Sequence, residues 1–518
     1  MKRLSPLAGL LCALLLLAGL AGITSTAAGP AAAAPASIAT LAAWTGCSGG
    51  FCHSTLTVPL DYAHPDDGRT VRLAVTRLAA DPSAGSYLGI VVGNPGGPGV
   101  SGTDEPFRAY SVPVTSARRY DWIGFDPRGV GASQPSLHCN PRYFGANRPS
   151  YVPRTRTLMR FWLRKIKGYA AACGRSSAHG LLPFMTTRDT AQDMESLRAA
   201  LQAQLPSVSP RRAALEKLNY LGFSYGTYLG EVYATLYPAR VGRFVLAGVV
   251  DPTRYWYGAN IDQDVWFDNA LTSFFRWVAA HPRRYHLGTS VAALRHGFYA
   301  ELRALDRHPS AGGRLGPDEL RDAMVDLTYT VNAWPATASA YSALVRYHRG
   351  GALYATYADD NRGAAADNLY AVYNAVQCTD QRAPAWSVQV RDTWRVHAKH
   401  PYMAWDNTWY NAPCIAWPAP ARPRVSVSGA ALVAQGAKIL LISETRDAAT
   451  PYSGALRTRG LFPTASLIAG VGGTTHAAAL DGVACVDDRI AAFLATGAVP
   501  ARQAGRRSDL SCPAVRRP

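Results

Sequence analysis

The chain has 518 residues, of which 48% are hydrophobic and 17% charged, so it holds enough apolar material for a core and is not an intrinsically disordered polymer. Its formal net charge is +18, because 53 Lys and Arg oppose 35 Asp and Glu. The arginines are scattered, and no zinc finger, helix-turn-helix or aromatic–basic motif accompanies them. The charge therefore does not indicate a nucleic-acid partner.

Residues 1–36 have the pattern of a secretory signal peptide: a basic start, an apolar run over residues 6–23, and small residues at a cleavage site. We expect the mature chain to begin near Ser37, and we expect a secreted monomer without stable membrane association. A retained membrane anchor is the alternative, since the apolar run is just long enough to span a bilayer.

From residue 70 onward, β-type runs alternate with helical ones. This rhythm is typical of a mostly parallel sheet with helices on both faces. The expected strands are 71–78, 87–92, 121–125, 218–223 and 243–250, and the expected helices are 188–204 and 225–236.

The rhythm breaks at about residue 252. Residues 260–400 are rich in Trp, Tyr, Ala and Arg with helical periodicity, and strand patterns return only after the Pro-rich stretch 413–424. We therefore predict an α/β core split by a helical insertion, a cap, over the ends of the strands. The predicted parts are 37–251 (first part of the core), 252–424 (cap) and 425–518 (last part of the core, with strands at 438–443 and 465–469 and a helix at 489–496).

The chain contains nine cysteines, and Cys12 would leave with the signal peptide. An even number in an exported chain indicates disulfides, although the sequence alone does not fix which cysteines pair. Because the cysteines fall into four local groups, our hypothesis is pairing in chain order. A zinc site is not indicated, since no His–Cys cluster occurs. The eight cysteines are Cys47, Cys52, Cys139, Cys173, Cys378, Cys414, Cys485 and Cys512.

The segment Gly222–Gly226 reads G-F-S-Y-G and matches the motif G-x-S-x-G, with an expected strand before it and an expected helix after it. A nucleophile on such a tight turn needs small neighbours, and the helix N-terminus places positive potential behind it. A plain Gly-rich turn is the alternative, because the pentapeptide alone can arise by chance. The strand–turn–helix context favours Ser224 as a nucleophile.

A serine nucleophile needs a base and an acid that orients the base, and in this architecture the order along the chain is serine, acid, histidine. Asp447 follows the expected strand 438–443, and His476 lies in a loop after the next strand. Both positions are carboxyl ends of strands, where sites of α/β proteins lie. Glu444 is the rival acid, which we interpret as a structural loop residue. For His476 the alternative is a surface loop histidine.

A tetrahedral oxyanion needs backbone N–H donors. The expected strand 87–92 ends in a Gly/Pro loop at 93–99, whose glycines allow close approach of the backbone to a substrate. We expect one donor from Gly97 and one from Tyr225. A plain turn or a phosphate-binding loop is the alternative, but no G-K-[ST] follows.

Four stretches resemble secreted actinobacterial α/β-hydrolase peptidases of the tripeptidyl aminopeptidase type, which are related to prolyl aminopeptidases. They are NPGGPGVSG at 94–102, GFDPRGVGAS at 124–133, YLGFSYGTYLG at 220–230 and DAATP at 447–451. The C-terminal block 485–512 is also similar, and the match is weakest in the helical insertion. The resemblance implies an α/β-hydrolase fold, a triad of Ser224, Asp447 and His476, and a cap that limits the substrate to a short N-terminal peptide.

Two residues depart from the family pattern. Ala477 follows His476 where the family usually has Gly, and Ala247 stands where an Asp is expected. The first change bears on the loop and on substrate fit. Neither change removes a residue of the triad.

An aminopeptidase must bind a free ammonium group, for which carboxylates in a partly dry pocket are suited. A solvated helix or loop carboxylate is the alternative for each candidate. The candidates are Asp380, Asp262, Asp264, Asp268 and Glu231.

The predicted function is a secreted serine exopeptidase that releases short peptides, tripeptides by the resemblance, from free N-termini through an acyl-enzyme. We expect its partners to be peptide substrates and expect no metal or organic cofactor. A secreted carboxylester hydrolase or lipase with the same triad is the first alternative. An inactive binding protein on the same scaffold is the second.

Overall fold

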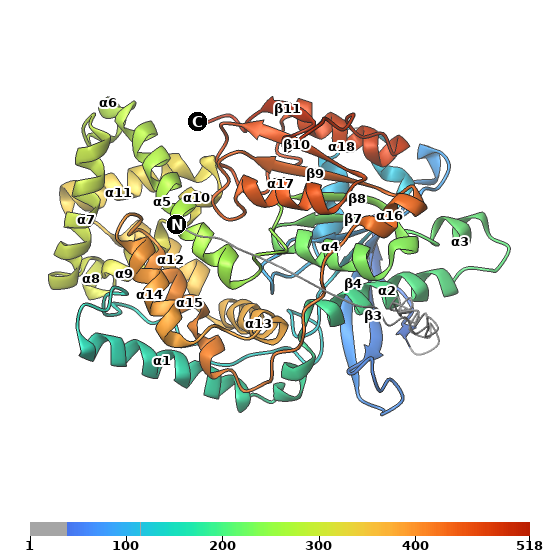
Figure 1. Ribbon diagram of the computed structural model, residues 1–518, viewed down its shortest axis with the longest axis horizontal. Helices are drawn as coiled ribbons and strands as arrows, with labels where there is room; N and C mark the ends of the chain where they lie inside the picture. The colour runs from blue at the N-terminus through green and yellow to red at the C-terminus, as the bar shows by residue number, and fades with distance from the viewer. Residues whose placement is uncertain (1–38, 114) are drawn as a thin grey trace, which may run out of the picture. The chain divides into compact units, whose positions relative to one another are not determined.

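The computed structural model describes residues 39–113 and 115–518, so the expected signal peptide and Cys12 lie outside the described residues. A single sheet runs through it in the order β1-β3-β4-β6-β5-β7-β8-β9-β10-β11, with β2 beside β3 (Figure 1). The strands are β1 (Thr40–Leu41), β2 (Thr45–Ser48), β3 (Phe51–Pro59), β4 (Thr70–Leu78), β5 (Gly89–Asn94), β6 (Tyr120–Phe125), β7 (Leu218–Phe223), β8 (Val241–Ala247), β9 (Lys438–Glu444), β10 (Ala465–Val471) and β11 (Leu510–Pro513).

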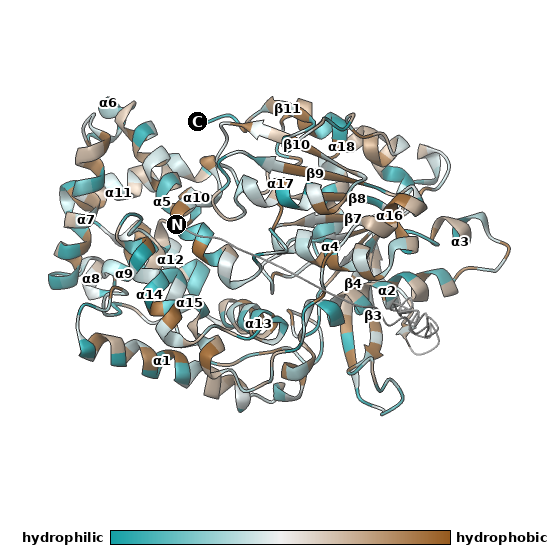
Figure 2. Cartoon of the chain, viewed as in Figure 1, coloured by the Kyte–Doolittle hydropathy of each residue, from teal (hydrophilic) through white to brown (hydrophobic). Residues whose placement is uncertain are grey.

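The sheet is parallel from β6 to β11, while β1, β2, β3 and β4 are antiparallel. Strands β5, β6 and β7 are buried at every position, as expected for parallel strands covered on both faces. In Figure 2 the neighbouring strands β7, β8 and β9 are largely brown, that is, hydrophobic. The mostly parallel sheet that the sequence predicts is confirmed.

Helices cover both faces of the sheet. On β5, Ile90 and Val92 join the apolar cluster that contains α2 (Thr187–Ala203) and α4 (Tyr225–Leu236). Val91 points the other way, into the cluster that contains α18 (Ala484–Thr496). This alternation follows from the two-residue period of a strand. The other helices of this part are α3 (Pro210–Ala214), α16 (Ala430–Gln435) and α17 (Tyr452–Leu461).

Between β8 and β9 the chain forms a group of helices and contributes no strand to the sheet. In Figure 1 this group lies to the left of the sheet. Its helices are α5 (Tyr257–Ala279), α6 (Pro282–Tyr285), α7 (Val291–Arg307), α8 (Ser310–Gly313), α9 (Pro317–Ala323), α10 (Asp326–Tyr329), α11 (Trp334–Tyr347), α12 (Gly351–Asn361), α13 (Ala364–Asp380), α14 (Trp386–His397) and α15 (Ala404–Asn411).

A further helix, α1 (Arg156–Gly174), comes from before β7 but packs against this helical group. Its buried Trp162 and Ile166 form one apolar cluster with Trp405 and Trp409 of α15. The sequence did not predict α1. Its apolar residues contact partners about 240 positions further along the chain, so no local strand–helix rhythm marks it.

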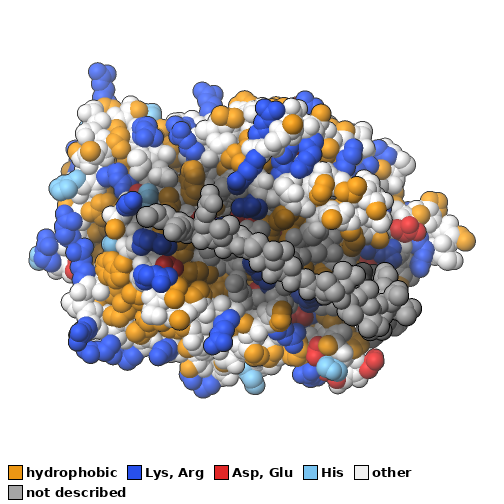
Figure 3. All heavy atoms as spheres, viewed as in Figure 1, with side chains coloured by type: hydrophobic (Ala, Val, Ile, Leu, Met, Phe, Trp, Pro, Cys, Tyr) orange, Lys and Arg blue, Asp and Glu red, His pale blue; other side chains and the backbone are white. Residues whose placement is uncertain are grey.

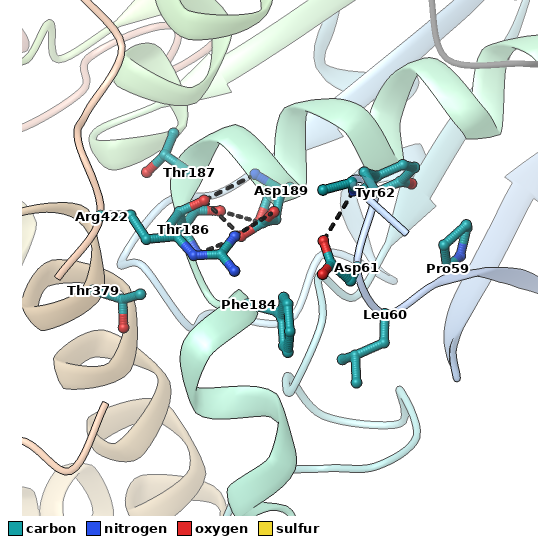
Figure 4. A network of polar contacts seen from close by, with 12 residues as sticks. Pro59, Leu60, Asp61, Tyr62, Phe184, Thr186, Thr187, Asp189, Thr379 and Arg422 are labelled. Atoms are coloured by element: carbon teal, nitrogen blue, oxygen red, sulfur yellow. Dashed lines mark hydrogen bonds and ion pairs between the residues drawn. The ribbon is translucent and has the colours of Figure 1, made fainter. Parts of the chain in front are cut away.

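After the helical group, the chain segment that contains Arg422 passes the N-terminus of α2 (Figure 4). Thr186 and Asp189 form a reciprocal capping box there. The Arg422 guanidinium lies 3.8 Å from Asp189 and 4.8 Å from the centre of the Phe184 ring. The Arg422 amide also donates to the carbonyl of Thr379 at the end of α13 (2.7 Å). These contacts join the segment that follows the helical group to α2 and to the end of α13.

The eight described cysteines form four disulfides in chain order, none spanning more than 36 positions: Cys47–Cys52, Cys139–Cys173, Cys378–Cys414 and Cys485–Cys512. The last one ties α18 to β11 at the edge of the sheet. In the described part of the chain, no helix is long and apolar enough to cross a membrane.

Candidate active site

Ser224 lies on the sharp turn between β7 and α4, with φ 55° and ψ −125°. Such a conformation is strained for a residue with a side chain, and strain of this kind concentrates at functional sites. The flanking glycines are required by close backbone contacts. A Cβ on Gly222 would lie 2.6 Å from the carbonyl oxygen of Gly226, and a Cβ on Gly226 would lie 2.6 Å from that of Asn94. The motif is therefore explained by packing as well as by chemistry.

Asp447 follows β9 directly and is fully buried. Its carboxylate accepts hydrogen bonds from the backbone amides of Ala449 and Thr450 (3.0 Å each) and from the Thr450 hydroxyl (2.9 Å). The Nδ1 atom of His476 lies 2.9 Å and 3.0 Å from its two oxygens. Because a carboxylate can only accept, Nδ1 carries the proton and Nε2 is left with its lone pair.

His476 is held from the helical group as well as from the core. Its backbone amide donates to the carbonyl of Tyr329 at the end of α10 (2.7 Å), and the two rings meet edge to face at 5.3 Å. Its Nε2 is buried and meets no partner among the described residues. Ser224 and His476 line the same cavity, which has a volume of about 520 Å³. A cavity of this size suits a small organic ligand.

The loop that carries His476 is fixed by Glu444. This buried carboxylate accepts from the backbone amides of Thr475 (2.5 Å) and Val515 (2.7 Å), and burial raises the pKa of Glu444 to about 7. No hydrogen bond joins it to His476 in the described structure, and its interpretation as a structural residue stays a prediction. Ala477, one of the two residues that depart from the family pattern, has φ 52°, a region in which glycine is favoured.

The Gly/Pro loop after β5 lies directly against the turn of Ser224. A Cβ on Gly96 would be 3.0 Å from the Ser224 Cβ and 3.1 Å from the Tyr225 nitrogen. Gly97 and Tyr225 both line the cavity. In the described structure, neither of their amides donates to another residue. Both expected donors therefore border the cavity that Ser224 also lines, and no described residue accepts from their amides.

The residues that the sequence singled out for ammonium binding are mostly engaged elsewhere. Asp380 accepts from the amide and hydroxyl of Thr187, and Glu231 from the hydroxyl of Thr458. Neither carboxylate lines the cavity.

The three remaining candidates lie on α5. Asp264 accepts from Asn407 (3.0 Å) outside the main cavity, and Asp268 pairs with Arg295. Asp262 does line the cavity, but it pairs with Arg254. The structure thus brings one of the five candidates to the cavity, and that one already has a cation.

Other carboxylates line the cavity in their place. Among the described residues that line the cavity, six are aspartates and none is Lys or Arg, in a chain with a net charge of +18. Figure 3 shows the contrast, because Lys and Arg side chains spread over the visible surface and far outnumber the acidic ones. The five aspartates that the sequence analysis missed are Asp251, Asp322, Asp326, Asp360 and Asp406. They come from the segment after β8 and from the helices α9, α10, α12 and α15, so no single local motif marks them.

Comparison with known proteins shows which family the chain belongs to. A family model described as TAP-like protein matches residues 400–512. A tripeptidyl aminopeptidase of Streptomyces coelicolor is 38% identical over 468 residues, which cover 88% of this chain and 82% of that protein. The chain belongs to the tripeptidyl aminopeptidase family.

Two further relatives come from Mycobacterium tuberculosis. Serine protease Hip1 is 28% identical over 493 residues, covering 88% of this chain and 89% of that protein. Carboxylesterase B is 31% identical over 466 residues, covering 86% and 84%. The predicted resemblance, the α/β-hydrolase fold class and the assignment as a serine hydrolase of the aminopeptidase type are confirmed.

Proposed function

We propose that this member of the tripeptidyl aminopeptidase family is a secreted exopeptidase that removes short peptides, tripeptides in particular, from free N-termini. One observation carries the proposal: Ser224 and His476, whose Nδ1 atom is hydrogen-bonded to the buried Asp447, line one cavity together with six aspartates. A free N-terminus is cationic at neutral pH, so this lining attracts the end of the peptide that an aminopeptidase must recognise. Four disulfides agree with an oxidising, extracellular setting.

In the proposed reaction the Ser224 hydroxyl attacks the scissile carbonyl carbon while its proton passes to Nε2 of His476. The amides of Gly97 and Tyr225 donate to the resulting oxyanion. The carbon–nitrogen bond then breaks, and His476 returns the proton to the leaving amine. Water repeats the sequence on the acyl-enzyme and releases the short peptide. Throughout, Asp447 fixes the tautomer of His476 and stabilises its charged form.

The test is turnover of a matched substrate panel: aminoacyl, dipeptidyl and tripeptidyl p-nitroanilides, their N-acetylated forms, and p-nitrophenyl acetate. We expect the free tripeptidyl substrate to be hydrolysed best and its acetylated form at least tenfold more slowly. Ser224→Ala should abolish turnover and labelling by a fluorophosphonate. Asp447→Asn should lower kcat by about 10⁴-fold, because His476 would then take the wrong tautomer.

The relative named Carboxylesterase B supports a second candidate, an ester hydrolase with the same triad. Hydrolysis of esters or N-blocked peptides in strong preference to free peptides would favour that function. A wild-type protein that a fluorophosphonate does not label would instead indicate a binding protein.

A further inference from the structure

Among the acidic residues of the cavity, Asp406 has an unusual environment. It lies in the first turn of α15, only 6% of its surface is exposed, and it lines the cavity. Its Oδ2 atom is buried and meets no hydrogen-bond donor in the described structure. A buried carboxylate oxygen without a donor is unfavourable by about 1–3 kcal/mol, or more when it is charged. The Asp406 side chain borders the cavity, so a ligand that donates to its carboxyl group would offset this cost.

The cation beside this carboxyl group, Arg148, already forms ion pairs with other carboxylates. Arg148 bonds to Glu319 (2.8 Å) and to Asp322 of α9 (2.5 Å), and its own surface is almost fully buried. Arg321 points to the backbone instead, where it donates to the carbonyl of Tyr402 (2.5 Å). Burial, followed by the charge of Asp322, raises the pKa of Asp406 well above its usual range. Asp322 and Asp406 are thus carboxyl groups within hydrogen-bond reach of each other, and only Asp322 has a cation.

The other buried carboxylates among the described residues differ from Asp406, either because they have hydrogen-bond donors or because they do not line the cavity. Asp264 and Asp380 have donors from Asn407 and Thr187. Unpartnered carboxylate oxygens also occur on Glu105, Glu231 and Asp318, but these side chains do not line the cavity. Within the described residues, Asp406 alone combines an unpartnered, buried carboxylate oxygen with access to the site of Ser224.

We propose that Asp406, together with Asp322, binds the α-ammonium group of the peptide substrate. An ammonium group brings three N–H donors and one positive charge, so it can donate to both carboxylates and supply the missing counter-charge. The pair then fixes where the N-terminus of the substrate rests relative to Ser224. This inference rests on the proposed function, since it assigns the residues that recognise the free N-terminus.

The test compares two substrates that differ only in the recognised group: a tripeptidyl p-nitroanilide with a free amine, and its desamino analogue, in which hydrogen replaces that amine. Asp406→Asn removes the carboxyl group that can ionise when an ammonium group binds, with little change in shape. We expect kcat/KM for the free-amine substrate to fall about 10- to 100-fold, the range for a hydrogen bond to a charged group. For the desamino analogue we expect a change of less than about threefold, so the preference for the amine collapses.

Asp264→Asn is the matched control, because it makes the same exchange at a buried aspartate next to α15 that does not line the cavity. It should keep the amine preference of the wild type. Hydrolysis of p-nitrophenyl acetate should persist in both variants and report an intact triad.

Three results would overturn the inference: an unchanged amine preference in Asp406→Asn, an equal loss for both substrates, or the same collapse in Asp264→Asn. A wild-type enzyme without any preference for the amine would instead refute the proposed function. The two failures are therefore distinguishable.

Discussion

The loop of His476 depends on a contact between Gly473 and Glu444, and Gly473→Ala is the sharpest probe of it. A Cβ on Gly473 would lie 2.1 Å from the Glu444 Cδ and 2.2 and 2.3 Å from its two carboxylate oxygens. Real Cβ atoms essentially never approach other heavy atoms so closely, so the buried carboxylate must move. It would then leave the amides of Thr475 and Val515 without their acceptor.

The magnitude follows from these two hydrogen bonds. Each amide that loses its acceptor destabilises by about 1–3 kcal/mol, so we expect Gly473→Ala to lower the free energy of unfolding by roughly 2–6 kcal/mol. Gly472→Ala is the neighbouring control. A Cβ there has no atom within 4 Å, but its φ of 76° is strained for alanine, so a loss of about 1 kcal/mol is expected. Because Thr475 precedes His476, kcat should fall in Gly473→Ala as well.

The assay is equilibrium urea unfolding of Gly473→Ala, Glu444→Ala and the double variant. Glu444→Ala removes the colliding carboxylate, so the second change should add less than about 1 kcal/mol in that background. If Gly473→Ala destabilises equally with and without the Glu444 carboxylate, the collision is not the cause and this account of the loop is wrong.

Two further predictions concern stability. Burial raises the pKa of Asp380 to about 7, whereas the pKa of an aspartate in an unfolded chain is about 3.9. The folded state therefore holds the proton more tightly than the unfolded state. The resulting stabilisation is present at low pH and is lost as the pH rises through 7. Between pH 5 and pH 8 the unfolding free energy of the wild type should fall by about 2–3 kcal/mol more than that of Asp380→Asn, and parallel urea-unfolding curves would contradict this assignment. Ala477→Gly should raise the unfolding free energy by about 0.5–1 kcal/mol, because glycine tolerates a φ of 52°; a lower midpoint in urea would show that the Ala477 methyl group contributes more by packing than it loses by strain.

The sequence predicted those parts of the site whose neighbours are close in the chain. The turn at Ser224 follows from a buried strand, two glycines and a helix within about twenty residues. Asp447 and His476 follow from their positions after β9 and β10. Their assignment as a triad stays a prediction until the variants are measured.

The parts that escaped prediction depend on long-range packing. The lining aspartates Asp322 and Asp406 lie on α9 and α15, and only the folded helical group brings them to one cavity. Helix α1 packs through Trp162 against residues far along the chain. Strand β11 has four residues, of which only Cys512 is buried, so no alternation marks it. In each case the local sequence pattern does not identify the distant residues that pack against the element.

The acidic cavity also bears on how the proposed reaction ends. Hydrolysis of the acyl-enzyme turns a neutral carbonyl into a carboxylate beside Ser224. Among the described residues, six aspartates and no Lys or Arg line this cavity, and two of the aspartates, Asp262 and Asp322, are already paired with arginines. The new terminus therefore forms in an acidic cavity that offers it no Lys or Arg partner. The charges that draw in one end of the peptide oppose retention of the other end once the bond is cut, which favours product release and disfavours resynthesis.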